Sequence, residues 1–309
     1  MTSDRATLTS RAAQASIAVA LFLLALKAWA AWRTGSVAML GSLADTGLDL
    51  IASVIVLVAV RVAARPPDHE HRYGHGKAEA LAALAQVTII SVSATAIGWR
   101  AVQRLAAGET TADAEYGIGV SLVAIAATLG LIAYQKHVIA RTGSIAIRTD
   151  RLHYQSDLLL NSAVIAALVL DQLLGFSGAD PLFGIAIAGW LLFGALRNAA
   201  GAIGQLMDRA WPDDRRRRLV EIVARHPEVR GVHDVRTRSS GPVEHAQFHI
   251  WVDPAMRVAR AHDLIEAIEG DLAAEFPGVD AIVHVDPEGQ VDEPGNPLAE
   301  NDESRILKS

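Results

Sequence analysis

Long apolar segments alternate with short polar ones over the first two thirds of the chain. A helix needs about 20 apolar residues to cross a hydrocarbon core about 30 Å thick, and six segments reach that length. The first of them is too long for the apolar core of a signal peptide. We therefore expect six membrane spans, at approximately Ala12–Trp32, Ser36–Ala63, Ala78–Val102, Tyr116–Val138, Ile145–Leu174 and Pro181–Gly204.

The pattern changes near Asp208, where the composition becomes that of a soluble protein. Apolar residues then follow a helical period in two segments and alternate with polar ones in strand-like segments. The expected elements are helix Asp213–Arg225, strands Val232–Arg238 and Glu244–Asp253, helix Val258–Phe276 and strand Ala281–Asp286. We expect a transmembrane domain over residues 1–208, a small α+β domain over 209–289 and a disordered tail over 290–309.

Composition favours a multi-pass α-helical membrane protein. Hydrophobic residues make up 51% of the chain and the mean hydropathy is +0.26, which is too apolar for an ordinary soluble protein. The absence of cysteine excludes disulfides, thiolate metal sites and cysteine nucleophiles. The net charge of −6 arises from segregated acids and bases, and no basic stripe indicates nucleic-acid binding.

Lysine and arginine near the ends of the spans indicate the orientation, because cytoplasmic loops carry an excess of both. On one side of the membrane lie Arg33, Arg100 and Arg104. The other side holds a larger set, namely Arg5, Arg11, Arg61, Arg65, Arg72, Lys77, Lys136, Arg141, Arg148 and Arg151. We therefore expect both termini in the cytoplasm.

Two acids interrupt the second span, where each costs roughly 2.5–3.5 kcal/mol at the helix centre. Asp45 and Asp49 lie one turn apart on one helix face, and His153 and Asp157 have the same spacing in the fifth span. Helix rise places both pairs roughly 13–20 Å from the outer face. Three carboxylates and one imidazole at this depth suit a tetrahedral divalent metal, and the imidazole favours zinc-like ions.

Two other interpretations of these acids remain open. Asp45 and Asp49 could pair with Lys27 or an arginine, or could cap a kink at Gly47. The site could also belong to a hydrolytic intramembrane enzyme, although the sequence holds no HExxH motif.

Further histidines and acids lie outside the spans. Asp68, His71 and His75 have gaps that a loop can fold around one ion, although a solvated loop also carries such residues. In the soluble domain the potential ligands fall one or two per element, and Asp286 could bridge two metals. This set comprises His233, His249, His262, His284 and Asp286.

Three histidines are not expected to bind metal. His245 shares a strand face with His249 but lies about 13 Å away along the strand, so both cannot bind one ion. We expect His137, His226 and His245 to be surface or structural residues.

Several stretches resemble the cation diffusion facilitator family, and closely its bacterial zinc and ferrous-iron efflux members. They are TGSVAMLGSLADTGLD, HRYGHGKAEALAALAQ, LHYQSD, LMDRA and VHDVRTRSSGP. The resemblance extends over nearly the whole chain, from Arg11 to Pro287. It implies six spans, a homodimer in the bacterial inner membrane, a metallochaperone-like α-β-β-α-β cytoplasmic domain, and exchange of metal for protons.

The resemblance also implies roles for particular residues. It assigns the transport site to Asp45, Asp49, His153 and Asp157, and a loop site to Asp68, His71 and His75. It assigns a two-metal cytoplasmic site to His233, His249, His262, His284 and Asp286, and pairs Lys77 with Asp208 at the dimer hinge. Asp rather than His at position 45 resembles members that accept cadmium and iron as well as zinc.

The expected function is that of a proton-coupled antiporter, not an enzyme. It exports Zn²⁺, with Cd²⁺ or Fe²⁺ as alternatives, by alternating access, and His153 carries a proton. The cytoplasmic cluster is expected to sense metal or to lock the dimer. One rival function is a proton-driven transporter of organic solutes, which the scarcity of aromatic and amide residues in the spans disfavours. The other is a membrane-anchored metal sensor without flux, which would not need acids at mid-bilayer.

Overall fold

The computed structural model describes residues 2–34, 37–107, 118–174, 179–241 and 243–290. The N-terminal part consists of long helices: α1 (Thr2–Thr34), α2 (Val37–Ala63), α3 (Ala78–Ala107), α4 (Ile118–Thr142), α5 (Ile145–Leu174) and α6 (Ala179–Leu206). Five of them, all except α5, are long and apolar enough over their described residues to cross a membrane. α5 packs among the others and carries the buried side chains of Asp150, His153 and Tyr154.

The membrane helices form two packed groups. α1 packs against α2 and α4, α3 packs along α6, and α5 contacts helices of both groups. Small residues permit the close approach of α3 and α6, since a Cβ added at Gly184 would lie 3.0 Å from the Cβ of Ala101. One apolar core joins α1, α2, α4 and α5, and a second joins α3, α5 and α6.

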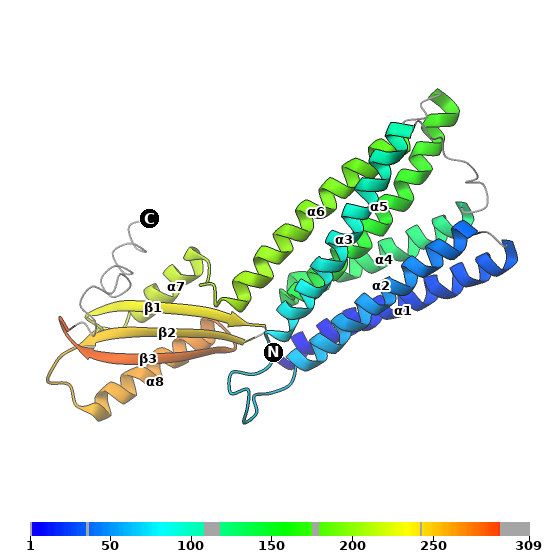
Figure 1. Ribbon diagram of the computed structural model, residues 1–309. Coiled ribbons are helices and arrows are strands. Elements are labelled where there is room, and N and C mark those ends of the chain that lie inside the picture. Colours follow the sequence, from blue (N-terminus) through cyan, green and yellow to red (C-terminus); the bar gives the residue numbers. More distant parts are fainter. Residues whose placement is uncertain (1, 35–36, 108–117, 175–178, 242, 291–309) are drawn as a thin grey trace.

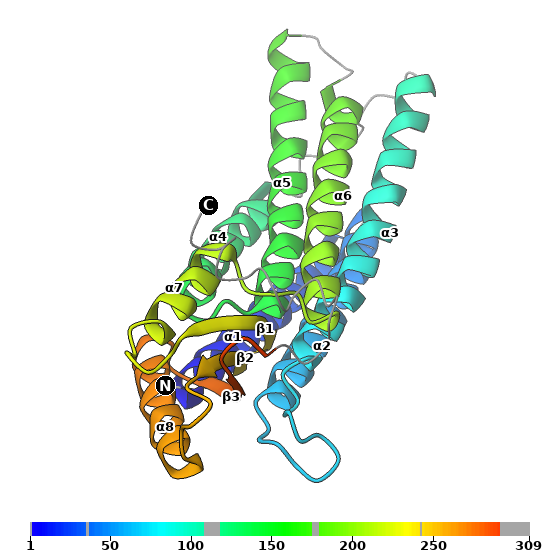
Figure 2. The same cartoon turned by 90° about the vertical axis from the view of Figure 1, so that its left-hand side faces the viewer.

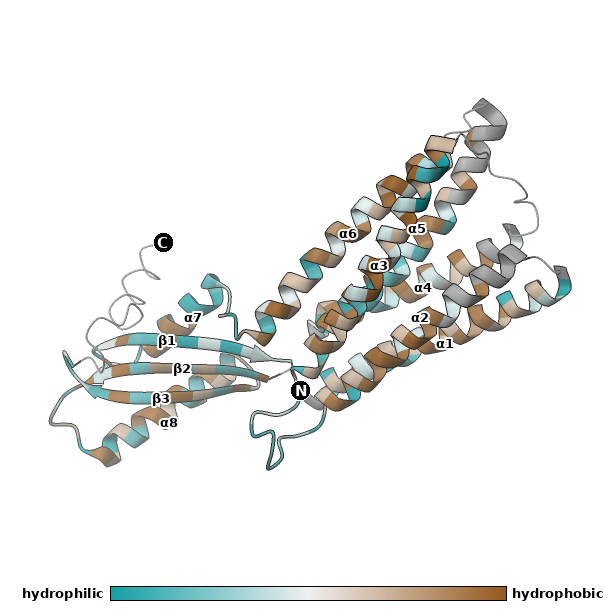
Figure 3. Cartoon of the chain, in the orientation of Figure 1, coloured by the Kyte–Doolittle hydropathy of each residue, from teal (hydrophilic) through white to brown (hydrophobic). Residues whose placement is uncertain are grey.

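The two helix groups lie together near the C-terminal domain and diverge away from it (Figures 1 and 2). Large apolar side chains such as Phe22, Trp29, Val92 and Phe193 are exposed on the outside of the bundle. The helices are accordingly brown over much of their length in Figure 3. A surface of this kind is suited to contact with lipid.

The C-terminal domain has the α-β-β-α-β order that the sequence predicts. Its elements are α7 (Asp213–Val223), β1 (Gly231–Ser240), β2 (Val243–Val252), α8 (Val258–Glu275) and β3 (Val279–Pro287). β2 is the central strand, antiparallel to β1 and parallel to β3, and α8 makes the crossover between the parallel pair. The fold class is therefore confirmed. The tail expected from residue 290 lies, from residue 291 onward, outside the described residues.

Strand register positions the polar residues of this domain. His233, His249 and His284 occupy paired positions on β1, β2 and β3, so they lie side by side across the sheet. The register of β1 shifts just after His233, where Asp234 has a φ of 49°. This irregularity lets consecutive residues of β1 both be buried.

Candidate metal sites

The first candidate site joins α2 to α5 inside the bundle. His153 Nε2 lies 2.8 Å from Asp49 Oδ1 and 4.0 Å from Asp157 Oδ2. The three potential ligand atoms all lie within 4.8 Å of one another. Asp45 lies one turn before Asp49 in α2, but its side chain is outside the described part of the structure. Three of the four predicted ligands are thus brought together, from the two helices that the spacing indicates.

The geometry of this cluster is compatible with a tetrahedral ion. Ligand atoms of a zinc site with bonds near 2.0 Å are separated by roughly 3.3 Å, a value between the two distances at His153. The side chains of Asp49 and Asp157 are 19% and 32% exposed, so the site is reachable rather than sealed. Lys27, considered above as a partner of the acids, donates a hydrogen bond to Thr46 at 2.7 Å.

A buried polar network lies one turn from His153, toward the C-terminal domain. Asp150 is fully buried and accepts hydrogen bonds from Ser16 Oγ at 2.6 Å, Gln135 Nε2 at 2.8 Å and Gln86 Nε2 at 3.0 Å. Tyr154 adds a hydrogen bond from its hydroxyl to the Ser16 carbonyl at 2.9 Å. The network joins α1, α3, α4 and α5. Sequence reasoning missed Asp150, although an acid and two amides within apolar helices were a usable signal.

The second candidate site lies in the loop between α2 and α3. Asp68 is 3.3 Å from both His71 Nδ1 and His75 Nε2, and the two imidazole rings are 4.5 Å apart. Asp68 Oδ1 also accepts the backbone N–H of His71 at 2.7 Å, and this bond lowers the pKa of the carboxyl group. The three residues predicted for this site are therefore together, on an exposed loop whose acid favours its ionised, metal-binding form.

The same loop is held against the β1–β2 hairpin. Tyr73 lies with its ring 4.4 Å from the Arg238 guanidinium and 5.6 Å from the ring of His245. His245 is buried, so its role is structural and it is not a surface residue. A Cβ added at Gly76 would lie only 2.0 Å from the Ser240 carbonyl oxygen, so the backbones of loop and hairpin are in contact.

An ion pair completes this junction. Lys77 Nζ lies 2.9 Å from Asp208 Oδ1, and Arg238 lies 3.6 Å from the same oxygen. Partial burial tends to raise the pKa of Asp208, but Lys77 and Arg238 outweigh it and hold the pKa below its usual value. The pair that the resemblance implies thus forms within one chain, where it ties the start of α3 to the segment after α6.

The third candidate site lies on the sheet of the C-terminal domain. His249 Nδ1 and His233 Nε2 approach Asp286 Oδ2 at 2.9 and 3.5 Å, while His284 Nε2 lies 3.1 Å from Asp286 Oδ1. The two carboxylate oxygens thus face different histidines, as a bridging ligand would. His262 is on α8, exposed, and 3.4 Å from Glu266, so a single chain does not bring it into this cluster.

Two other predicted structural histidines and one unpredicted acid are also placed. His226 lies 3.4 Å from Asp271, and His137 is exposed. Asp234 was not predicted, yet it lies 3.7 Å from His249 Nε2 and accepts hydrogen bonds from Arg236. Its left-handed backbone conformation at the strand irregularity turns it toward the cluster, which strand alternation alone cannot predict.

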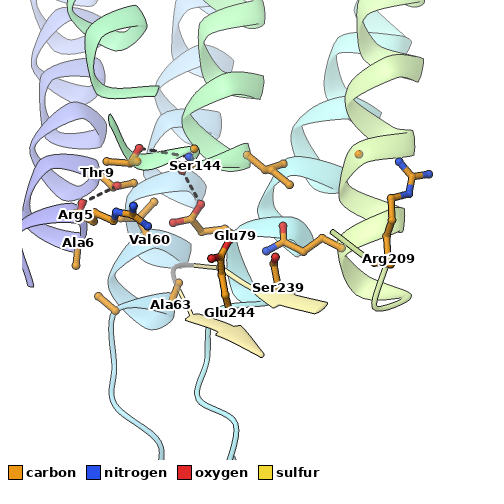
Figure 4. A pocket seen from close by; sticks show the side chains of 18 residues that line it. Arg5, Ala6, Thr9, Val60, Ala63, Glu79, Ser144, Arg209, Ser239 and Glu244 are labelled. Carbon is orange, nitrogen blue, oxygen red and sulfur yellow. Dashed lines mark hydrogen bonds between the residues drawn. The ribbon is translucent and has the colours of Figure 1, made fainter. Parts of the chain in front are cut away.

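A cavity of about 300 Å³ lies where the bundle meets the C-terminal domain (Figure 4). Glu79 reaches it from α3 and Glu244 from β2. Glu79 is buried and accepts a hydrogen bond from Ser144 Oγ at 2.6 Å, just before the start of α5. Glu244 is held by a two-pronged pair with Arg215 at 2.7 and 2.8 Å. Arg5 and Arg209 also line this cavity, so acidic and basic side chains share it.

Comparison with known proteins gives consistent matches over both parts of the chain. A family model described as the cation efflux transmembrane domain matches residues 13–207, and one described as the cation efflux protein cytoplasmic domain matches residues 211–288. The cation-efflux pump FieF of Pectobacterium carotovorum subsp. carotovorum (strain PC1) is 44% identical over 93% of this chain and 96% of that protein. FieF of Cronobacter sakazakii (strain ATCC BAA-894) is 44% identical over 93% and 95%.

Two of the solved structures that match cover about a quarter of this chain. The Zn form of CzrB is 33% identical, covering 28% of this chain and 99% of that one, with a TM-score of 0.25. A cadmium form of the MamM CTD is 30% identical, covering 24% and 91%, with a TM-score of 0.22.

Proposed function

We propose that this chain, which belongs to the cation efflux family, exports Zn²⁺ from the cytoplasm in exchange for protons. Its cation-efflux relatives already indicate a transporter of divalent metal cations, not an enzyme. The observation that carries the proposal is the convergence of Asp49, His153 and Asp157 from two helices to within 4.8 Å of one another inside the bundle.

The ligand chemistry supports zinc as the exported ion. Carboxylates with an imidazole in a four-ligand site favour zinc-like metals over Mg²⁺ and Ca²⁺, which take more oxygen ligands. Asp45 supplies the fourth ligand in this proposal. Because Asp rather than His at position 45 resembles family members that accept cadmium and iron, Cd²⁺ and Fe²⁺ are the next ions to test as substrates.

Proton exchange follows from the same ligands. A carboxylate or imidazole must be deprotonated to bind metal, so metal release and protonation are linked. His153 is the proposed proton carrier because an imidazole changes its charge within the physiological pH range. His153 Nε2 lies 2.8 Å from Asp49 Oδ1, so the imidazole and the carboxylate can share an arriving proton.

Alternating access is supported by the arrangement of the helices. The two helix groups diverge away from the C-terminal domain, and the acids of the site are partly exposed (Figure 1). The Asp150 network holds α1, α3, α4 and α5 together on the opposite side. We propose that this network is the barrier between the metal site and the cytoplasm. Rocking of α3 and α6 opens the barrier, and the junction cavity then receives the ion.

The proposed assembly is a homodimer in the bacterial inner membrane with both termini in the cytoplasm. Residues 1–208 form the transporting domain, and residues 209–289 form a metal-sensing, dimer-locking domain. The family model of the cytoplasmic domain matches residues 211–288, which supports the bounds proposed for the second domain. His262 lines one cavity with His284, which supports a second metal position between these two histidines.

The test is uptake of radioactive zinc by proteoliposomes under an imposed pH gradient. Asp49→Asn and Asp157→Asn are expected to abolish uptake, whereas Asp263→Asn, a surface change, should leave it unaltered. Uptake at the wild-type rate in either site variant would contradict the proposal. Zinc binding without uptake would favour the sensor, and uptake independent of the pH gradient would remove the proton exchange.

A further inference from the structure

A groove between α5 and α6 has an arginine-rich lining that holds none of the proposed metal ligands. Its volume is about 620 Å³, and it lies at the end of the bundle next to the C-terminal domain. Four of its lining side chains are arginines, contributed by Arg148 and Arg151 of α5, Arg197 of α6 and Arg209 just beyond α6. The described lining includes no acid, so the groove is strongly cationic.

These arginines are available to a ligand. Within the described part of the chain, none of the four takes part in an ion pair, and the buried Nε of Arg151 has no hydrogen-bond partner. A buried guanidinium nitrogen without a partner is costly, so a ligand that accepts its hydrogen bond is favoured. Guanidinium groups bind phosphate oxygens in two-pronged geometry, which makes a phosphate the best-matched anion.

The two helices align their polar residues along the groove. Arg148, Arg151 and Gln155 lie three and four residues apart on α5, and Arg197 and Asn198 lie within one turn of each other on α6. Glycine at position 194 of α6 leaves room for the side chain of α5 opposite, since an added Cβ would lie 3.0 Å from Leu152 Cδ1. The groove is therefore a surface built by both helices, not one helix end.

Beyond the groove, toward the middle of the bundle, apolar side chains lie on the same helix faces as its polar residues. Phe193, one turn before Arg197, is 67% exposed, and Leu159, one turn beyond Gln155, is 37% exposed. A ligand with its phosphate among the arginines would therefore have its remainder beside apolar side chains. That polarity matches a phospholipid, whereas a soluble phosphate would gain nothing from the apolar part.

We propose that this groove binds the headgroup of one anionic phospholipid per chain, with its phosphate held by the arginines of α5 and α6. Basic pockets between membrane helices at such a boundary are suited to anionic headgroups. The assignment does not rest on the metal ligands, because none of the groove residues belongs to a proposed metal site, although Arg209 also lines the junction cavity.

The test is native mass spectrometry of the full chain released from nanodiscs of phosphatidylethanolamine and phosphatidylglycerol. Wild type should retain one phosphatidylglycerol per chain. Each arginine near an anionic lipid contributes a factor of about five, so Arg151→Gln combined with Arg197→Gln should weaken retention roughly thirtyfold. The matched control is Arg65→Gln combined with Arg141→Gln, which lie at the same end of the bundle but outside the groove.

Three results would overturn the proposal. They are equal retention in the groove and control variants, no preference for phosphatidylglycerol over phosphatidylethanolamine, and displacement of the lipid by inorganic phosphate. If the first groove variant fails to fold, Arg148→Gln combined with Arg209→Gln decides the question, because both of these side chains are exposed. An unchanged thermal unfolding midpoint in the variants is the check on folding.

Discussion

Asp150 accepts hydrogen bonds from three helices other than its own, so its replacement tests what holds the inner end of the bundle closed. Asp150→Leu keeps a similar shape but removes every acceptor. Hydrogen bonds between membrane helices contribute about 0.6 kcal/mol on average and at most about 1.7 kcal/mol. Losing three of them should therefore lower the free energy of unfolding by about 2–5 kcal/mol.

Reversible unfolding in mixed micelles measures this loss. Asp150→Asn should cost less than Asp150→Leu, because one acceptor oxygen remains for the donors of Ser16 and Gln135. The control is Thr88→Val, because Thr88 is exposed and its hydroxyl bonds only within its own helix at 3.0 Å. A surface change of this kind should cost about 0.5 kcal/mol or less.

Zinc binding separates a structural role of Asp150 from a ligand role. Because Asp150 is engaged by Ser16, Gln86 and Gln135, the variants should bind zinc within about tenfold of wild-type affinity while they unfold more easily. If Asp150→Leu is as stable as Thr88→Val, the Asp150 network does not hold the helices together and the reasoning is refuted. Loss of zinc binding in a fully folded variant would instead place Asp150 among the ligands.

Three further outcomes are expected. Gly76→Ala should release the loop from the hairpin, because the added Cβ would lie 2.0 Å from a backbone carbonyl oxygen. Amide hydrogen exchange in the loop should therefore become faster. Gly270→Ala is the control, because a Cβ added there has nothing within 4 Å. His249→Ala should remove one zinc per chain in metal analysis of the monomeric fraction, whereas His262→Ala should not. Equal zinc losses in the two variants would contradict the placement of His262 outside the Asp286 cluster. The lowered pKa of Asp208 means that its ion pair stabilises the junction above the ordinary carboxyl range and is lost as the pH falls through that lowered value. Spin-label distances across the junction should therefore stay constant down to about pH 4, and a change near pH 6 would contradict this.

The sequence predicts the six long helices, and five of them, all except α5, are apolar enough over their described residues to cross a membrane. The first expected span, Ala12–Trp32, lies within α1, which begins ten residues earlier, at Thr2. The polar segment containing Arg5 and Arg11 has no glycine or proline to end a helix, so the helix extends beyond its apolar part. Hydropathy therefore measures the length in lipid and not the length of the helix.

The candidate sites differ in how visible they are to sequence reasoning. Asp49, His153 and Asp157 are predictable because i,i+4 spacing fixes which side chains share a helix face. Asp150 can be singled out as an acid within an apolar helix, but its partners cannot, because they are 15, 64 and 134 residues away and no local spacing relates them. The contact of Tyr73 with Arg238 is hidden for the same reason, since the docking of a loop on a hairpin depends on tertiary structure alone.

The distribution of charge at the inner end of the bundle limits where a cation can approach the site. The α5–α6 groove presents arginines without a neighbouring acid in its described lining, whereas the junction cavity sets Glu79 and Glu244 against Arg5 and Arg209. At about 6 Å and an effective dielectric constant near 20, one arginine opposes a divalent cation by about 5–6 kcal/mol. The groove is thus closed to Zn²⁺ by repulsion even where it is open in space. In the transport path proposed above, an ion from that side enters through the junction cavity, where the carboxylates of Glu79 and Glu244 offset the charge of Arg5 and Arg209, and the Asp150 network lies between it and Asp49.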